Sequence, residues 1–157
     1  MTDTISHLSD AKRELVAFRI GQQEFAIDIT SVREIRGWTP ETPLPHAPSF
    51  VRGVINLRGT VRPIRCLAAR LGIGASKPTA RHVIIVVHVG THMLGLLVDA
   101  VSDILSAGAD QFQATPEIGT EAVRQFMQGV LPMDGRMIAI LALDEVLPSV
   151  PSLAFVA

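Results

Sequence analysis

The sequence predicts a mainly β protein built from two small barrels that are related by internal duplication. Two observations support this fold class. Short apolar runs rich in β-branched residues alternate with glycine-containing turns, which is typical of strands joined by hairpins. The same spacing of apolar, acidic and glycine residues also occurs twice along the 157-residue chain. Each repeat is too small for a large core of its own, so we expect the two to pack together.

The repeat consists of two blocks without gaps. Counted from Gly21 and from Gly90, residues of the same character lie at equal distances: Phe25 and Leu94, Ile27 and Leu96, Val32 and Val101, Glu34 and Asp103, and Ile35 and Ile104. In the second block, Gly53 and Gly59 have the same six-residue spacing as Gly129 and Gly135. We therefore expect equivalent glycines to occupy equivalent turns of the two barrels.

In the first repeat, residues 15–20 are predicted to form a strand and residues 21–23 a hairpin turn. Phe25, Ile27 and Ile29 alternate with other residues as in a half-buried strand. After a loop, Pro48 is expected to begin a short helix that ends at Gly53, because proline lacks only an N–H that the first helical turn leaves unpaired anyway. A glycine-bounded strand pair follows.

In the second repeat, the runs 83–87 and 93–98 are predicted to pair as a hairpin that is buried on both faces. No charged residue occurs from position 82 to 98, but His88, Gly90 and His92 interrupt this stretch, which argues against a membrane span. Residues 121–128 are expected to form a helix with one apolar face that ends at Gly129, and a second strand pair follows.

These elements predict one domain over residues 13–147. Its barrel subdomains are expected at about 13–75 and 80–147, joined by residues 72–79, and the pattern leaves open whether they exchange a strand. Residues 1–12 and 148–157 are expected to be tails, because the first is polar and the second begins with a proline-interrupted segment. The N-terminus lacks the basic start and apolar run of a signal peptide, which favours a cytoplasmic protein.

The net charge of −1 conceals an uneven distribution. Residues 42–98 contain no acid and seven bases, whereas residues 99–157 contain eight acids and two bases. One interpretation is that the basic middle is neutralised by the acidic ends within one fold. The other is a basic face that receives an acidic partner. Both can hold at once.

The residues with catalytic or ligand-binding chemistry form no recognisable active site, so we expect no enzyme, cofactor or metal. His88 and His92 flank a turn but lack nearby carboxylates or thiolates for a zinc site. Residues 72–77 lack the spacing of a phosphate-binding loop. Cys66, the single cysteine, is predicted to be a buried thiol.

Binding of single-stranded nucleic acid is the main alternative drawn from the residues themselves. Small β-barrels with arginines along a strand bind single strands by stacking the bases on aromatic side chains. Residues 51–81, where the arginines cluster, contain no Phe, Tyr or Trp. Arginines without stacking partners favour contact with a protein.

Three segments closely resemble the bacterial chemotaxis coupling protein (CheW) family. They are residues 27–37 with Val-Arg-Glu-Ile-Arg-Gly at their end, residues 50–59 with Gly-Val-Ile-Asn-Leu-Arg-Gly, and residues 95–104. The resemblance implies two packed five-stranded, SH3-like barrels. It also implies a non-catalytic cytoplasmic adaptor, recruited to membrane-associated arrays, that joins the cytoplasmic tip of a chemoreceptor to the regulatory domain of a CheA-type histidine kinase. The positions that match partner-binding residues of the family are Val32, Glu34, Gly53, Arg58, Val83, Gly95 and Ile104.

One segment departs from the family pattern. After Gly59 the family usually has an apolar residue, a proline, two apolar residues and Asp-Leu, whereas here Arg62, Arg65 and Cys66 stand in place of apolar, apolar and aspartate. For Val83 and Ile104 a plain core role is an equal alternative to partner contact. The departure keeps a second hypothesis open, a divergent scaffold of another chemosensory pathway.

Overall fold

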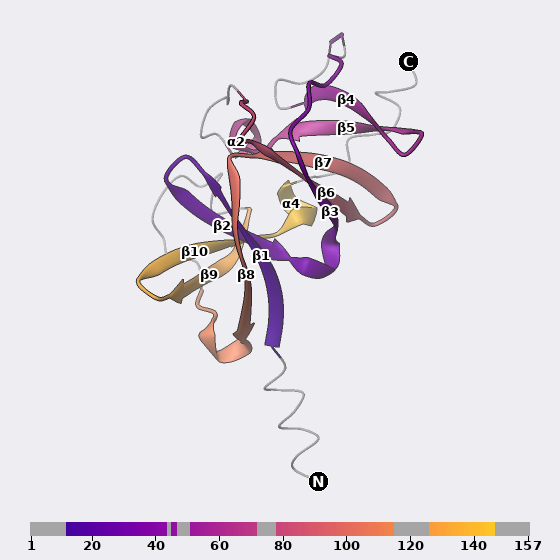
Figure 1. The fold of residues 1–157 in the computed structure, drawn as a ribbon. Helices are drawn as coiled ribbons and strands as arrows, with labels where there is room; N and C mark the ends of the chain where they lie inside the picture. The colour runs from indigo at the N-terminus through magenta and orange to yellow at the C-terminus, as the bar shows by residue number, and fades with distance from the viewer. Residues whose placement is uncertain (1–11, 44, 47–50, 72–77, 115–125, 147–157) are drawn as a thin grey trace.

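The computed structural model describes residues 12–43, 45–46, 51–71, 78–114 and 126–146 (Figure 1). Within them, strands predominate and the helices are short. The strands are β1 (Lys12–Ile20), β2 (Gln23–Asp28), β3 (Val32–Gly37), β4 (Val51–Leu57), β5 (Thr60–Cys66), β6 (Val83–Val89), β7 (His92–Val98), β8 (Ala100–Gly108), β9 (Met127–Met133) and β10 (Arg136–Leu141). The helices are η1 (Ile29–Ser31), α2 (Leu67–Arg70), η2 (Ala109–Gln111) and α4 (Leu143–Val146). None of the helices in the described part is long and apolar enough to cross a membrane.

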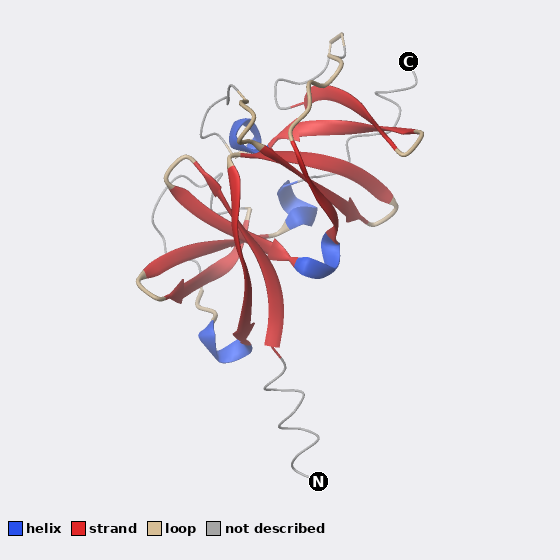
Figure 2. Cartoon of the chain, in the orientation of Figure 1, coloured by secondary structure: helices blue, strands red, loops and turns tan. Residues whose placement is uncertain are grey.

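The strands form two five-stranded sheets of the same design (Figure 2). The terminal sheet has the order β8-β1-β2-β10-β9, and the central sheet has the order β3-β6-β7-β5-β4. Replacing each strand of the terminal sheet with its repeat equivalent (β1 with β6, β2 with β7, β8 with β3, β9 with β4, β10 with β5) produces the order of the central sheet. The mainly β fold with two duplicated five-stranded units is thus confirmed.

The strand register shows that the duplication extends to individual residue pairs. In the outer pairing, Glu34 faces Val86 in the central sheet, as Asp103 faces Ala17 in the terminal sheet. Both pairings contain a register shift at the residue before the acid. In the parallel pairings, Ile64 faces Gly95 and Ile140 faces Ala26. The equivalent strands therefore share the same pairing register, residue by residue.

The two sheets do not coincide with the subdomains expected at about 13–75 and 80–147. The central sheet consists of the continuous segment 32–98, whereas the terminal sheet combines 12–28 with 100–141. The repeats thus exchange three strands each rather than one, because the chain crosses between the sheets at η1 and again at Asp99. A repeat pattern specifies which segments are alike, but it does not specify which of them form hydrogen bonds with each other.

Two predicted helices are not found where the structure describes the chain. Residues 51–53 belong to β4 and residues 127–129 belong to β9, so the ends of both predicted helices are strand. Residues 48–50 and 121–125 lie outside the described residues, as do residues 1–11, 72–77 and 147–157. Gly53 and Gly129, the predicted helix caps, instead lie in strands against the backbone of a neighbouring segment. An apolar periodicity over a few residues cannot distinguish such a strand glycine from a helix cap.

Three cores hold the sheets together. Strands β1 and β2 of the terminal sheet and β6 and β7 of the central sheet turn one face to a core shared by the two sheets and the other face to their own sheet's core, so the hairpin predicted to be buried on both faces is confirmed. On β1, Phe18 and Ile20 belong to the core shared by the two sheets, whereas Leu15 and Ala17 belong to the terminal sheet's own core. Residues of α2 and α4 also pack into the shared core, and Figure 1 shows α4 between the sheets.

Candidate functional site

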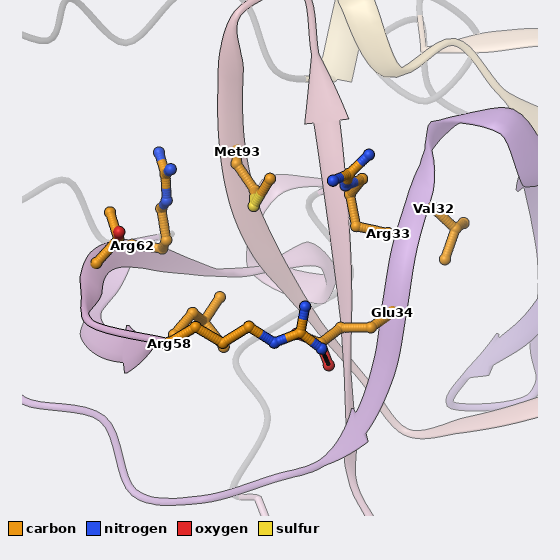
Figure 3. Close-up of a pocket in the computed structure, with 8 residues that line it drawn as sticks. Val32, Arg33, Glu34, Arg58, Arg62 and Met93 are labelled. Atoms are coloured by element: carbon orange, nitrogen blue, oxygen red, sulfur yellow. Dashed lines mark hydrogen bonds and ion pairs between the residues drawn. The ribbon is translucent and has the colours of Figure 1, made fainter.

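A hollow of about 340 Å³ lies on the central sheet, between the start of β3, the turn joining β4 to β5 and the start of β7 (Figure 3). Three of the seven predicted site residues line it. The lining residues are Val32, Arg33, Glu34, Leu57, Arg58, Thr60, Arg62 and Met93.

The turn between β4 and β5 presents Arg58 to the hollow. Arg58 and Gly59 both have positive φ angles, 53° and 87°, and they form a two-residue loop between the paired residues Leu57 and Thr60. Such turns match the twist of the strands, and the Gly59 N–H donates to Asn56 Oδ1 at 2.8 Å. The turn therefore sets the backbone conformation of Arg58, and among the described residues the Arg58 side chain makes no contact that holds the turn in place.

Glu34 and Arg58 form an ion pair across the hollow. Arg58 Nη2 lies 3.4 Å from Glu34 Oε2. The Arg58 side chain is 82% exposed, whereas that of Glu34 is 28% exposed. Because solvent screens such a pair, we expect it to contribute at most ~1 kcal/mol to stability. Contacts with another molecule can therefore replace the ion pair at little cost in free energy.

Two further arginines enter the hollow without partners among the described residues. Arg33 is exposed at the register shift of β3, and Arg62 is half-buried on β5 (Figure 3). No hydrogen bond or ion pair involves either side chain within the part of the chain that is described. Val32, Leu57 and Met93 supply apolar surface to the same hollow. The site therefore combines an apolar lining with three guanidinium groups and one carboxylate.

The equivalent place on the terminal sheet is occupied by an internal ion network. The strand register equates Arg136 with Thr60, Glu24 with Met93, and Asp103 with Glu34. Arg136 Nε donates to Glu24 Oε1 at 2.8 Å, and Arg136 Nη1 lies 3.5 Å from Asp103 Oδ2. Ser102 Oγ donates to Glu24 Oε2 at 3.3 Å. The hydrogen bonds that Arg136 donates to Glu24 lower the pKa of Glu24, although burial opposes this, and the same bonds raise the pKa of Arg136.

Replacing Glu24 with glutamine is expected to lower the free energy of unfolding at neutral pH by about 1–2 kcal/mol, because the partly buried charge-assisted bonds to Arg136 are lost. Since the pKa of Glu24 is lowered in the folded state, its contribution is complete above the unfolded pKa and disappears as pH falls through the folded pKa. Denaturant titrations should therefore show the difference from wild type shrinking below about pH 4–5. The Glu14→Gln variant, at an exposed position of β1, serves as the control. A pH-independent difference would contradict this account.

The other four predicted residues lie away from the hollow. Gly95 is buried in β7, and a Cβ atom there would lie 2.5 Å from Ile64 Cδ1 and 2.7 Å from Ile84 Cγ2. Gly53 lies in β4 against the backbone of Thr42. Val83 is half-buried at the start of β6 and packs against the shared core. Ile104 is 59% exposed on β8 of the other sheet. Whether any of these residues contacts a partner stays a prediction.

The exposed apolar residues follow the repeat as well. Among the described residues, the large hydrophobic side chains that remain exposed are Ile35, Val61, Ile104 and Met137. The register equates Ile35 with Ile104 and Val61 with Met137. Each sheet thus presents two exposed apolar residues, on β3 and β5 in the central sheet and on β8 and β10 in the terminal sheet.

Sequence reasoning singled out neither Arg33, Thr60 nor Met93 as site residues. Arg33 lies in the segment 27–37 that resembles the family, between Val32 and Glu34, and only these two neighbours were predicted to bind a partner. The available signal was the repeat itself, because aligning the two blocks places arginine, threonine and methionine where the other repeat has serine, arginine and glutamate.

The arginines of the basic middle segment have separate roles in the structure. Arg52 lies 3.0 Å from Glu41, and Arg58 pairs with Glu34, so both bind acids from the first 41 residues. Arg65 is 4% exposed. Cys66 is buried, as predicted. His88 Nε2 lies 3.1 Å from the carbonyl oxygen of Thr30. The arginines therefore do not form one continuous basic strip along a strand.

The family model described as a CheW-like domain matches residues 14–150. The chain is 56% identical over 149 residues to the chemotaxis protein CheW of Rhizobium meliloti (strain 1021), with 95% of this chain and 96% of the relative covered. It is 28% identical to protein FrzA of Myxococcus xanthus over 85% of this chain and 82% of the relative. The crystal structure of the scaffolding protein TtCheW from Thermoanaerobacter tengcongensis superposes with a TM-score of 0.80 at 29% identity, covering 88% of this chain and 94% of that one.

Proposed function

This chain belongs to the CheW family of chemotaxis scaffolds, and on that premise we propose that it joins a chemoreceptor tip to a CheA-type histidine kinase. It acts as an adaptor in chemotaxis signalling. Its proposed partners are the regulatory domain of the kinase and the cytoplasmic tip of the receptor. Its proposed location is the cytoplasm, at membrane-associated receptor arrays, and it carries out no reaction of its own.

The convergence of Val32, Glu34 and Arg58 at one hollow is the observation that supports this proposal best. These residues come from β3 and from the turn between β4 and β5, which are distant in sequence. The apolar side chains of Val32, Leu57 and Met93 line the same hollow. An apolar surface next to a weakly held ion pair is typical of a protein interface, where aromatic, aliphatic and arginine side chains contribute most of the binding energy.

A scaffold of another chemosensory pathway is the second candidate. The arginine at position 62 favours it, because the family usually has an apolar residue there and Arg62 faces the proposed contact site. Binding of single-stranded nucleic acid has less support, since no aromatic residue lines the hollow and bases would lack a stacking surface.

The experiment is a reconstitution with the purified chain, a candidate kinase and a soluble receptor signalling fragment. We expect kinase autophosphorylation to rise with receptor only when the chain is present, and all three to sediment together. The chain alone should hydrolyse no nucleotide. Failure to bind either the kinase or the receptor would contradict the proposal, and retention of a single-stranded oligonucleotide would favour the alternative class.

A further inference from the structure

The two equivalent surfaces of this molecule differ in how their charges are compensated. On the terminal sheet, Arg136 has Glu24 and Asp103 beside it, so one guanidinium faces two carboxylates. On the central sheet, Glu34 is the one acid among the residues that line the hollow, and it shares this lining with Arg33, Arg58 and Arg62. The fold thus contains the same strand arrangement twice, once with two acids for one arginine and once with one acid for three arginines.

Single substitutions between the repeats produce this difference. Met93 occupies the place of Glu24 and Thr60 the place of Arg136, so the central sheet lacks both members of this ion pair. Arg62 occupies the place of Ile138, which is fully buried in the other repeat. The half-buried Arg62 and the exposed Arg33 together add two positive charges beyond the Arg58 and Glu34 pair.

We propose that this hollow binds a pair of carboxylate side chains on a protein partner, with Arg33 and Arg62 as the groups that recognise them. The inference rests on the proposed adaptor function and adds the chemistry of the partner surface. Guanidinium groups bind carboxylates through charge-assisted hydrogen bonds, often bidentate. A guanidinium group would bind the partner's acids as Arg136 binds Glu24 and Asp103 inside the terminal sheet.

The lining of the hollow favours a protein rather than a free anion or a nucleic acid. Val32, Leu57 and Met93 present apolar surface beside the guanidinium groups. An acidic side chain next to an aliphatic one on a partner can satisfy both kinds of surface at once. A free phosphate would leave the apolar part uncovered.

The first test removes the recognising charges. The Arg33→Gln, Arg62→Gln double variant should bind one of the two partners about tenfold more weakly than wild type, and its affinity should lose most of its salt dependence. Arg81→Gln removes an exposed arginine outside the hollow and should leave affinity within about twofold. Thermal unfolding verifies that each variant is folded. Wild-type affinity of the double variant for both partners would overturn the proposal.

The second test supplies the missing acid from within the chain. Met93→Glu places a carboxylate at the position of Glu24 and should compete with the partner's acids, so affinity should fall by about tenfold. Met93→Gln has the same size without the charge and should bind more tightly than Met93→Glu. Equal affinities of the two variants would contradict an electrostatic role for the hollow.

A third measurement does not depend on the kinase or the receptor. The blocked tripeptide Glu-Leu-Glu should shift the NMR signals of the Arg33 and Arg62 side chains of the wild-type chain, whereas Gln-Leu-Gln should not. If the chain binds neither kinase nor receptor but the acidic peptide still shifts these signals, the adaptor function fails and the carboxylate site stands. Absence of shifts, or equal shifts with inorganic phosphate, would overturn the site as a docking place for acidic protein segments.

Discussion

Replacing Gly53 with alanine is expected to lower the free energy of unfolding by about 3 kcal/mol or more, a large effect for a single methyl group. A Cβ atom at this position would lie 2.2 Å from the carbonyl oxygen of Thr42, and the φ angle of Gly53 is +153°, which side chains rarely adopt. Both the close contact and the backbone angle must therefore change.

The strand around Gly53 has little freedom to move away. The N–H groups of Thr42 and Val54 each donate to the other's carbonyl oxygen at 2.9 Å. The adjacent Glu41, whose side chain is 7% exposed, accepts hydrogen bonds from Trp38 Nε1 at 3.0 Å and from Arg52 Nε at 3.1 Å. Displacing Thr42 would disturb these bonds, and a buried carboxylate that loses its partners is costly.

Two other glycines serve as matched controls. Gly21 has a φ angle of +61° but open space around its Cβ position, so Gly21→Ala should cost only about 1 kcal/mol. Gly129 is the repeat equivalent of Gly53, and its Cβ would lie 2.6 Å from the carbonyl oxygen of Gln113 without a positive φ. Gly129→Ala should therefore have an intermediate effect. Urea titrations with a constant slope measure all three.

This experiment also separates two interpretations of Gly53. The family resemblance implies that Gly53 contacts a partner, whereas its surroundings imply a role in folding. If Gly53→Ala keeps wild-type stability and loses partner affinity, the residue is a contact. If stability falls and the folded fraction binds normally, any loss of binding in cells follows from loss of the fold.

Replacing Arg58 with alanine is expected to weaken binding of the kinase or the receptor by about 1–3 kcal/mol, because interface arginines often contribute this much. The same change should alter the free energy of unfolding by less than ~1 kcal/mol, since the Arg58 side chain is 82% exposed and its pair with Glu34 is screened. Calorimetric titration and chemical denaturation measure the two quantities separately.

Glu34→Ala should behave in the same way, and the double variant completes the cycle. Because each residue contacts the other, removing both should cost less affinity than the sum of the single changes. Arg81→Ala is the control for loss of an exposed arginine elsewhere. A large fall in melting temperature with unchanged partner affinity would assign both residues to the fold and remove them from the binding site.

The sequence by itself determined most of the strands and their duplication, although not the two short helices predicted to end at Gly53 and Gly129. The β-branched run 83–87 was enough to predict a strand buried on both faces, and equal spacings from Gly21 and Gly90 were enough to pair equivalent turns. These features depend on the alternation of side chains and on local backbone angles, which act over a few residues.

Only the tertiary structure decided which strands share a sheet and which surface is open. Exchange of β3–β5 and β8–β10 leaves every local pattern unchanged, since the same hydrogen-bonding edges and apolar faces are satisfied in either arrangement. The ion network of Arg136 with Glu24 joins residues 112 positions apart, and only the parallel pairing of β10 with β2 brings them together. The absence of such an ion network among the described residues around Met93, the equivalent of Glu24, becomes visible once that pairing is known. Charge compensation depends on distance in space rather than along the chain.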